Sequence, residues 1–356
     1  MEKDDESLFQ IWNSDQKPEK QTSTNTFTQY LYNFKEVQFI GQIALGSKKK
    51  IFKVIFDSGS SALWVTTPKD MFAKGKLHYS CDKKESTTCK KGNFAKKFIG
   101  YGSGKIYGNI VTEDIWIPNI VTKRTKISDE GLRQIKGEYL SNKANTWGHI
   151  KDQDIILVHD SPGMSKVKAD GVLGVGPSDK ADIKSIFTNL KKQGVIEKEI
   201  FSIYLSTDEK KKPSELEIGG YDKVLVEKTG NEIVWAPILG KEKWKIALDD
   251  VLIDDKSIYA KRSVLSEALT MLKQIFVFPD FSNINNKVAL IDSGSSWIII
   301  TLSDGEKYLE ACKKRGVDCK LDGGMIFCIK DSNWIDKLPK IEFVIKGKKY
   351  PIKNDL

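Results

Sequence analysis

One short motif occurs twice in this chain, and that repetition constrains the fold more than any other feature. "VIFDSGSSALWV" spans residues 54–65, and "ALIDSGSSWIII" spans residues 289–300. In both copies an apolar run leads directly into Asp-Ser-Gly-Ser-Ser. Asp and Gly are poor strand formers, so each copy predicts a strand that ends in a tight loop. Because a turn alone needs no second copy, we expect the two loops to work together.

The rest of the chain is dominated by short apolar runs. Of its 356 residues, 40% are hydrophobic and 10% are aromatic, which is enough for a large buried core. Runs of about four to eight residues, rich in Ile, Val and aromatic side chains and separated by Gly, Asp-Gly or Pro, predict an all-β protein. At this length we expect two lobes.

Only two segments have clear helical spacing. Residues 182–194 place apolar side chains three and four positions apart, with Gly194 as the expected C-cap. Residues 303–316 form the second expected helix, with Ser303 as N-cap and Glu306 completing a capping box.

Two other segments lack strand and helix patterns. Residues 1–25 are polar and are predicted to form a flexible leader. Residues 119–144 are long, basic and weakly patterned, which predicts an inserted surface loop.

The repeated loops supply two carboxylates, Asp57 and Asp292. Two carboxylates within hydrogen-bonding distance cannot both ionise cheaply, so one keeps a proton while the other is charged. Such a pair can hold a water, deprotonate it for attack on a carbonyl, and protonate the leaving amide. The glycine permits a sharp turn, and neighbouring hydroxyls can hydrogen-bond the carboxylates. The pattern therefore predicts one shared site built from one loop of each lobe.

Other functional classes fit the sequence less well. Lys and Arg number 57 against 48 acids, a formal charge of +9, but the lysines are scattered and no aromatic stacking motif accompanies them, so we expect no nucleic-acid partner. The three histidines have no metal-ligand spacing, which predicts no metal site. The "GSGK" at 102–105 lacks the remaining residues of a phosphate loop, and we expect no cofactor. No run approaches the roughly 18 apolar residues of a membrane span.

The chain has five cysteines. Cys81 and Cys89 could close a small loop or remain free thiols. Cys319 and Cys328 flank a Gly-Gly turn that would place them on facing strands, although Cys312 could instead pair with Cys319. Loop-closing cysteines favour an oxidising compartment.

In order and spacing, these motifs resemble those of the pepsin-like aspartic proteases. "FIGQIALGSKKKIFKVIFDSGSSALWV" (39–65) resembles the strands that lead into the first catalytic loop, and "YGSGKIYG" (101–108) is similar to the flap hairpin. "ADGVLGVG" (169–176) matches the segment that packs behind that loop. "LPKIEFVIKGKKYPI" (338–352) resembles a strand pair of the second lobe. The Lys-rich composition and the second Asp-Ser-Gly look most like plasmepsin-type enzymes of apicomplexan parasites.

The resemblance implies a bilobal fold, with an N-terminal lobe at 26–207 and a C-terminal lobe at 208–356. It makes Asp57 and Asp292 the catalytic pair and places Tyr101 on the flap, leaning on Trp64. Ser60 and Ser295 would hydrogen-bond the carboxylates. The residues expected to bind substrate are Tyr101, Gly102, Ser103, Gly59, Gly294, Ser60, Ser295 and Trp64.

The expected function is hydrolysis of internal peptide bonds in a protein or peptide bound in extended form, in a secretory or vacuolar acidic compartment. The family pattern continues beyond the strand pair at 338–352. We therefore expect the second lobe to be incomplete, this chain alone to be nearly inactive, and Cys328 to be able to pair with a cysteine of the missing part. The alternative is a pepsin-like scaffold without turnover that acts as a binding protein.

Overall fold

The computed structural model describes residues 26–35, 37–119, 146–177, 183–206, 213–230, 232–259, 287–329 and 334–352. The predicted leader and residues 120–144 of the predicted inserted loop lie outside these ranges. None of the described helices is long and apolar enough to cross a membrane.

The first part of the chain folds into one ten-stranded sheet with the strand order β5-β6-β7-β4-β8-β3-β2-β1-β10-β9. Its strands are β1 (Phe27–Phe34), β2 (Gln38–Leu45), β3 (Lys50–Asp57), β4 (Leu63–Thr66), β5 (Lys90–Gly100), β6 (Lys105–Asn119), β7 (Thr146–Asp160), β8 (Gly171–Gly174), β9 (Phe201–Tyr204) and β10 (Ser214–Ile218). Its helices are η1 (Met164–Lys166), α3 (Ile186–Lys192) and α4 (Lys223–Thr229). Although β10 lies past residue 207, it pairs with β1 in this sheet.

The second part has three smaller sheets, β11-β14, β13-β12-β17-β18 and β15-β16. The strands are β11 (Lys245–Leu248), β12 (Asp250–Ile253), β13 (Lys256–Ser257), β14 (Lys287–Leu290), β15 (Cys319–Asp322), β16 (Met325–Cys328), β17 (Ile341–Ile345) and β18 (Lys348–Pro351). The helices are α6 (Leu302–Lys314) and α7 (Trp334–Lys337). The fold is therefore all-β and bilobal, as predicted.

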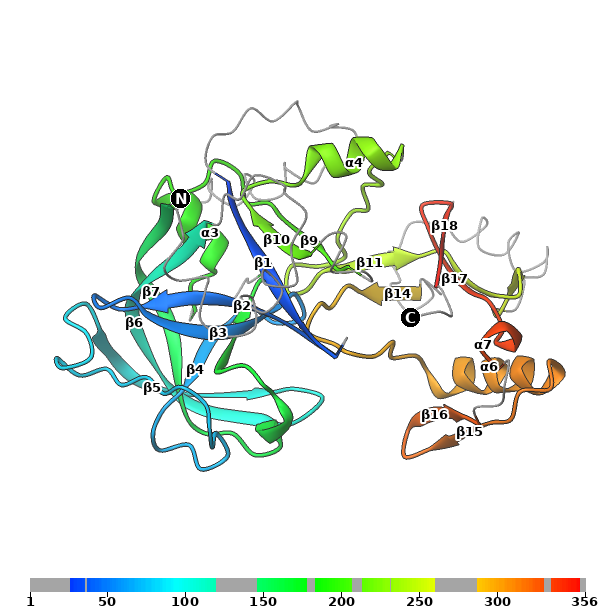
Figure 1. The fold of residues 1–356 in the computed structure, drawn as a ribbon, viewed down its shortest axis with the longest axis horizontal. Helices are drawn as coiled ribbons and strands as arrows, with labels where there is room; N and C mark the ends of the chain where they lie inside the picture. The colour runs from blue at the N-terminus through cyan, green and yellow to red at the C-terminus, as the bar shows by residue number, and fades with distance from the viewer. Residues whose placement is uncertain are drawn as a thin grey trace, which may run out of the picture.

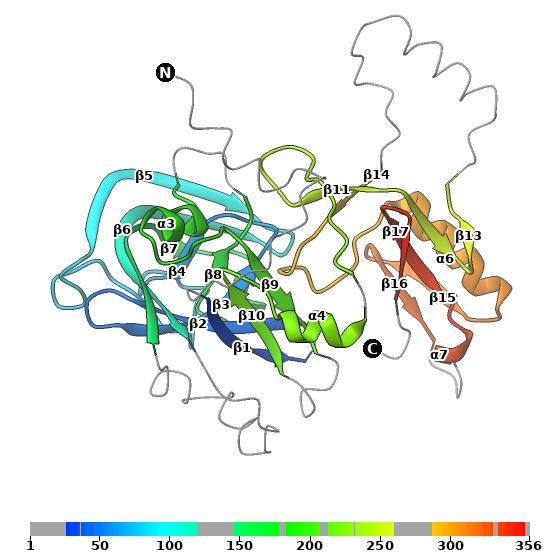
Figure 2. The ribbon, with the colours of Figure 1, turned by 90° about the horizontal axis from the view of Figure 1, so that it is seen from above.

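The two parts lie side by side. Both views place β1 to β10 and α3 on one side and β15 to β18, α6 and α7 on the other, with β11 and β14 running between them (Figures 1 and 2). Trp244 joins the two parts, since its indole Nε1 donates to the Val175 carbonyl at 3.1 Å.

Most of the core lies in the first part. Two clusters of buried apolar residues fill the ten-stranded sheet, and β8 is buried along its whole length because strands flank it on both sides. Among the described residues after 230, the buried apolar side chains are Val251, Leu252, Ile253, Cys312 and Val317. The supports available to the two Asp-Ser-Gly-Ser-Ser loops are therefore unequal.

The helix at 182–194 is confirmed but shorter, since α3 covers Ile186–Lys192. The C-cap is Gln193 rather than the predicted Gly194, which follows it with the positive φ of 68° that glycine readily adopts after a helix. The second helix is also confirmed, but its predicted capping box is wrong. α6 begins at Leu302, and the side chain of Thr301 accepts from the Asp304 N–H at 3.2 Å. Thr301 therefore takes the place assigned to Ser303.

Candidate active site

The first Asp loop is held by a central strand. Asp57 is the last residue of β3, which lies between β2 and β8 in the sheet. Its side chain is only 6% exposed. The carboxylate accepts from the Gly59 N–H at 2.9 Å and from the Ser60 hydroxyl. The predicted contact of Ser60 with this carboxylate is therefore present.

The segment behind this loop approaches it closely. Gly174 of β8 is in register with Asp57, and its N–H donates to the Ala62 carbonyl at 2.9 Å. A Cβ on Gly174 would lie 2.5 Å from the Ala62 nitrogen, so only glycine fits without moving the backbone. The Val175 N–H, directly after β8, donates to the Asp57 carbonyl at 2.8 Å, so residues 174 and 175 hold both ends of the loop.

The second loop repeats the local turn but not its surroundings. The Gly294 N–H donates to Asp292 Oδ1 at 2.9 Å, which matches the bond from Gly59 to Asp57. Asp292 is more exposed than Asp57. The prediction that Ser295 bonds its carboxylate is wrong, because the Ser295 hydroxyl donates to the Trp297 carbonyl at 2.9 Å.

Four hydrogen bonds join the two loops through Ser58 and Ser293. The Ser58 N–H donates to Ser293 Oγ at 3.0 Å, and the Ser293 N–H donates to Ser58 Oγ at 2.8 Å. Each hydroxyl also donates to the carbonyl of the residue just before the opposite aspartate. Ser58 donates to Ile291 at 2.8 Å, and Ser293 donates to Phe56 at 2.7 Å. These two serines were not predicted as site residues. Their signal was available, because both motif copies carry serine directly after the aspartate.

The paired loops bring the two carboxyls together. A Cβ on Gly59 would lie 2.6 Å from the Asp292 carboxyl carbon, and one on Gly294 would lie 2.3 Å from Asp57 Oδ1. Burial raises the pKa of Asp57 from 3.8 to about 6, while the Ser60 hydroxyl opposes the rise and the charge of Asp292 and a side-chain hydrogen bond with it add to it. Below about pH 6, Asp57 therefore keeps a proton at the junction of the loops.

Tyr101 lies in the hairpin of β5 and β6, close enough to Asp57 to feel its charge. The hairpin turn is closed by the Tyr101 N–H donating to the Gly104 carbonyl at 2.7 Å. The Tyr101 hydroxyl accepts from Trp64 Nε1 at 2.8 Å, and their ring centroids are 6.3 Å apart. Burial, together with the Asp57 charge, raises the pKa of Tyr101, which keeps the phenol neutral.

The two other flap residues differ in their surroundings. Nothing lies within 4 Å of a Cβ on Gly102, so the flap tip is open there. The Ser103 hydroxyl contacts Met164 Sδ of η1 at 3.4 Å. Ser103 therefore bonds to η1 rather than to the carboxyl pair.

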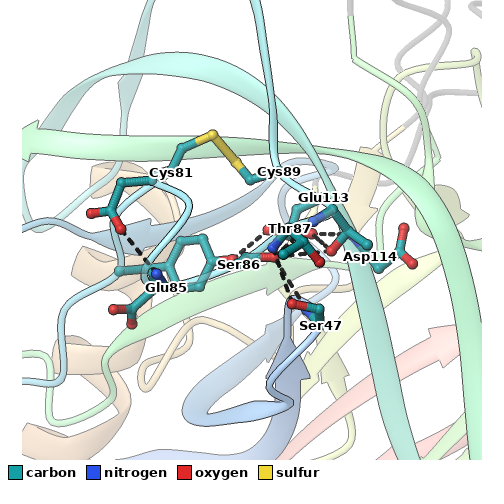
Figure 3. Close-up of a disulfide and its surroundings, with 11 residues drawn as sticks. Ser47, Cys81, Glu85, Ser86, Thr87, Cys89, Glu113 and Asp114 are labelled. Carbon is teal, nitrogen blue, oxygen red and sulfur yellow. Dashed lines mark hydrogen bonds between the residues drawn. A yellow bond between two sulfur atoms is a disulfide. The ribbon is translucent and has the colours of Figure 1, made fainter.

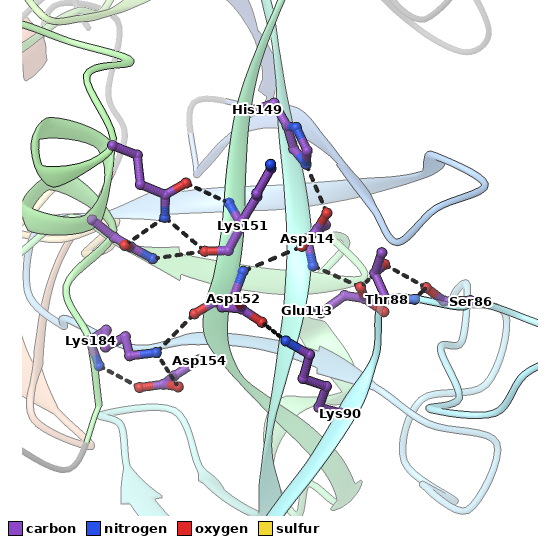
Figure 4. Close-up of polar contacts among 12 residues, drawn as sticks. Ser86, Thr88, Lys90, Glu113, Asp114, His149, Lys151, Asp152, Asp154 and Lys184 are labelled. Atoms are coloured by element: carbon purple, nitrogen blue, oxygen red, sulfur yellow. Dashed lines mark hydrogen bonds and ion pairs between the residues drawn. The ribbon is translucent and has the colours of Figure 1, made fainter.

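A separate group of acidic residues, drawn in Figure 4, lies on β6 and β7. Asp114 bonds His149 at 2.9 Å, and Asp152 pairs with Lys90 at 2.6 Å. The His149 ring stacks on Trp116 with centroids 3.7 Å apart. His149 is therefore a packed strand residue that ties β6 to β7, and this network serves the sheet.

Both predicted disulfides are present, Cys81–Cys89 and Cys319–Cys328. The first closes the loop that carries Ser86 and Thr87 (Figure 3). Ser86 accepts from the Ser47 N–H at 3.1 Å, and the Thr87 N–H donates to the Ser47 hydroxyl at 3.0 Å. This disulfide therefore fixes a loop against the turn between β2 and β3.

An all-β fold that pairs two carboxyls across related loops, with one raised pKa, defines the class of hydrolases that activate water with two aspartates. The chain also matches the family model "Eukaryotic aspartyl protease" over residues 38–139 and 131–355. It belongs to this family.

Several known proteins are similar to the chain. Pepsin II-2/3 of Oryctolagus cuniculus is 26% identical over 340 residues, covering 94% of this chain and 71% of that protein. Cyprosin of Cynara cardunculus is 27% identical over 232 residues, covering 64% of this chain and 42% of that protein. Cathepsin E of Cavia porcellus is 27% identical over 256 residues, covering 71% of this chain and 58% of that protein. The chain thus spans less than two thirds of the length of two of these three relatives.

Proposed function

We propose that the protein is an aspartic endopeptidase that hydrolyses internal peptide bonds of protein substrates with Asp57 and Asp292. The observation that carries this proposal is the contact of the two carboxyls across the paired loops, with the pKa of Asp57 at about 6. Below that pH Asp57 keeps its proton, and a protonated carboxyl beside a charged one is the state that the proposed reaction needs. That state supplies both the base and the acid for peptide hydrolysis.

In the proposed reaction the charged carboxylate takes a proton from a water held between the two aspartates. The water oxygen attacks the peptide carbonyl, while the protonated carboxyl donates its proton to the carbonyl oxygen. The resulting tetrahedral intermediate then collapses with proton transfer to the leaving amine. Every proton in this cycle comes from the attacking water, Asp57, Asp292 or the substrate, so the cycle needs no metal or organic cofactor.

The proposed substrate is a polypeptide in extended form that lies beneath the hairpin of Tyr101. Trp64 supports this role because its Nε1 donates to the Tyr101 hydroxyl and so holds Tyr101 near Asp57, whose charge raises the pKa of the phenol. The open surroundings of Gly102 leave room for a bound chain at the hairpin tip. Closing such a hairpin over the substrate would exclude water from the reacting bond.

The proposed setting is an acidic secretory or vacuolar compartment. The two disulfides favour an oxidising environment. A pKa of about 6 for Asp57 favours activity in acid, because the shared proton is lost as the pH rises past that value. Within the family we propose a plasmepsin-type enzyme, which the Lys-rich composition and the Asp-Ser-Gly of the second loop support.

Conservative substitution of each aspartate tests the proposal. Asp57→Asn and Asp292→Asn keep the shape of the site but remove the water-activating pair. Each should lower cleavage of an unfolded protein substrate in acid by at least about a hundredfold. Asp322→Asn, at an exposed position of β15, is the matched control and should cut at the parent rate. Parent-level activity in both site variants would refute the proposal.

A second candidate is a binding protein with the same scaffold and no turnover. It is favoured by the weak support of Asp292, because β14 pairs only with β11 among the described strands. A shift of about 1 Å in a catalytic group can cost on the order of a hundredfold in rate. Saturable binding of extended peptides without cleavage at any acidic pH would favour this candidate over the enzyme.

A further inference from the structure

Three sulfur atoms lie close together where the last turn of α6 contacts the β15–β16 hairpin. The Cys319–Cys328 disulfide joins directly opposed positions of the β15–β16 hairpin. Cys312, in the last turn of α6, is the one free cysteine of the five and is fully buried. The three sulfur atoms all lie within 4.8 Å of one another. A free thiol thus lies next to a disulfide.

We propose that Cys312, Cys319 and Cys328 form a thiol–disulfide exchange site. Exchange makes Cys328 the free cysteine in place of the buried Cys312, and the Cys328 thiol can react with external disulfides. In the exchange the Cys312 thiolate attacks Cys319 Sγ. The Cys312–Cys319 bond forms, the Cys319–Cys328 bond breaks, and Cys328 leaves as a thiolate that takes up the proton lost by Cys312. The number of disulfides is unchanged, so this step needs no oxidant.

Ring size favours attack on Cys319 over attack on Cys328. The present disulfide closes a separation of 9 residues, and a Cys312–Cys319 bond would close a similarly short one of 7. Closure entropy changes slowly with loop length, so these two connectivities are nearly equal in that respect. A bond from Cys312 to Cys328 would close a larger ring and carries a greater closure cost.

Access to solvent differs between the two forms. In the present form the free thiol is Cys312, which has no exposed surface. After exchange the free thiol is Cys328, which is half-buried at the end of β16, next to the exposed Phe327 and Ile329. A surface pocket lined in part by Leu309, Gly316 and Cys319 adjoins the same cluster. A reagent too large to reach Cys312 can therefore reach Cys328 only after exchange.

The chemical state of Cys312 sets the conditions of the test. Burial raises the pKa of its thiol, and Asp254 adds to the rise, while Tyr308 and Arg315 oppose it. Because the thiolate is the attacking species, exchange should be slow in acid and faster in mildly alkaline buffer. The protein can therefore be quenched with acid before the bonds are mapped.

The test uses the folded protein and oxidised glutathione as the external disulfide. A Cys328 thiolate would attack one glutathione sulfur, forming a mixed disulfide and releasing one glutathione thiol. After an acid quench, tryptic peptides mapped by mass spectrometry under non-reducing conditions identify each bond. Trypsin separates the three cysteines, because Lys313, Arg315 and Lys320 lie between them. The expected product is a Cys312–Cys319 peptide pair with glutathione on Cys328.

Two variants and an internal control make the outcome decisive. In Cys328→Ser, oxidised glutathione should act as the oxidant: Cys312 and Cys319 form a disulfide, two glutathione thiols are released, and no glutathione stays on the protein. Cys312→Ser should keep Cys319–Cys328 and also take up none. The Cys81–Cys89 disulfide has no third cysteine nearby among the described residues and should keep its connectivity throughout. Glutathione on Cys312 of the parent protein, an unchanged Cys319–Cys328 bond under all conditions, or two free thiols in folded Cys328→Ser would each overturn the proposal.

Discussion

The two Asp-Ser-Gly-Ser-Ser loops have the same sequence and the same local turn, yet the protein supports them differently. The Asp57 loop follows β3, which has strands on both sides, and β8 braces it from behind. The Asp292 loop follows β14, which pairs only with β11 in the part of the chain that the structure describes. Figure 1 shows β3 inside the large sheet and β14 between the two parts of the molecule.

The residues that follow each loop show the same contrast. After the first loop, Ala62, Leu63 and Trp64 are buried. After the second loop, Trp297 is 70% exposed and Ile299 is 84% exposed. The motif therefore specifies the turn and its glycine-to-aspartate hydrogen bond, while the surrounding strands decide how deeply the turn is buried. The hydrogen bonds between Ser58 and Ser293 tie the second loop directly to the first.

The largest expected effect concerns the packing behind the two loops. Leu173 of β8 is 1% exposed, so Leu173→Ala should lower the free energy of unfolding by about 2–5 kcal/mol. Ile299→Ala, at the exposed position after the second loop, should change it by less than about 0.5 kcal/mol. Denaturant unfolding measures both changes in the free energy of unfolding, provided that its dependence on denaturant concentration has the same slope in each variant as in the parent. Equal losses would mean that Ile299 is covered in solution and that the contrast between the loops is false.

The next effect concerns the buried charge. Because the folded pKa of Asp57 is about 6 against an ordinary 3.8, the folded state binds the proton more tightly. Its stabilising contribution is complete below about pH 4 and is lost as the pH rises through about 6. Asp57→Asn should therefore unfold less readily than the parent near pH 7, by on the order of 1–3 kcal/mol, and differ little near pH 4. Unfolding curves of the parent and of Asp57→Asn at the two pH values provide the measurement. An equal difference in stability at both pH values would exclude the charge of Asp57 as its cause.

The smallest effect separates the two hydroxyls of the motif. Ser60 donates to Asp57 and so favours its charged form, whereas Ser295 donates to a backbone carbonyl. Ser60→Ala should raise the pKa of Asp57 further, by about one unit. The pH at which the cleavage rate falls on the alkaline side should rise by the same amount. Ser295→Ala should leave that pH unchanged. Carboxyl carbon NMR titration reads the same shift without requiring turnover, and equal shifts in both variants would contradict the assigned contacts.

Much of the candidate site follows from the sequence. The repeated Asp-Ser-Gly-Ser-Ser predicts Asp57 and Asp292 as the paired carboxyls of the site. It also predicts the turn at each one, because a short motif specifies a turn through bonds between near neighbours. The glycine N–H that reaches each carboxylate two positions back is such a bond. The Gly-Gly turn at 323–324 is also a local feature, and it places Cys319 opposite Cys328 on the facing strand.

Contacts between distant residues were decided by the tertiary structure alone. Whether a serine of the motif turns to the carboxylate, as Ser60 does, or to a carbonyl, as Ser295 does, depends on the packing around it. The start of α6 at Thr301 and the crossed bonds of Ser58 and Ser293 depend on it in the same way. The sequence by itself determined two identical turns, since a turn is held by bonds within a few residues. Only the tertiary structure buried the first aspartate and left the second half-buried, because burial depends on strands brought from elsewhere in the chain.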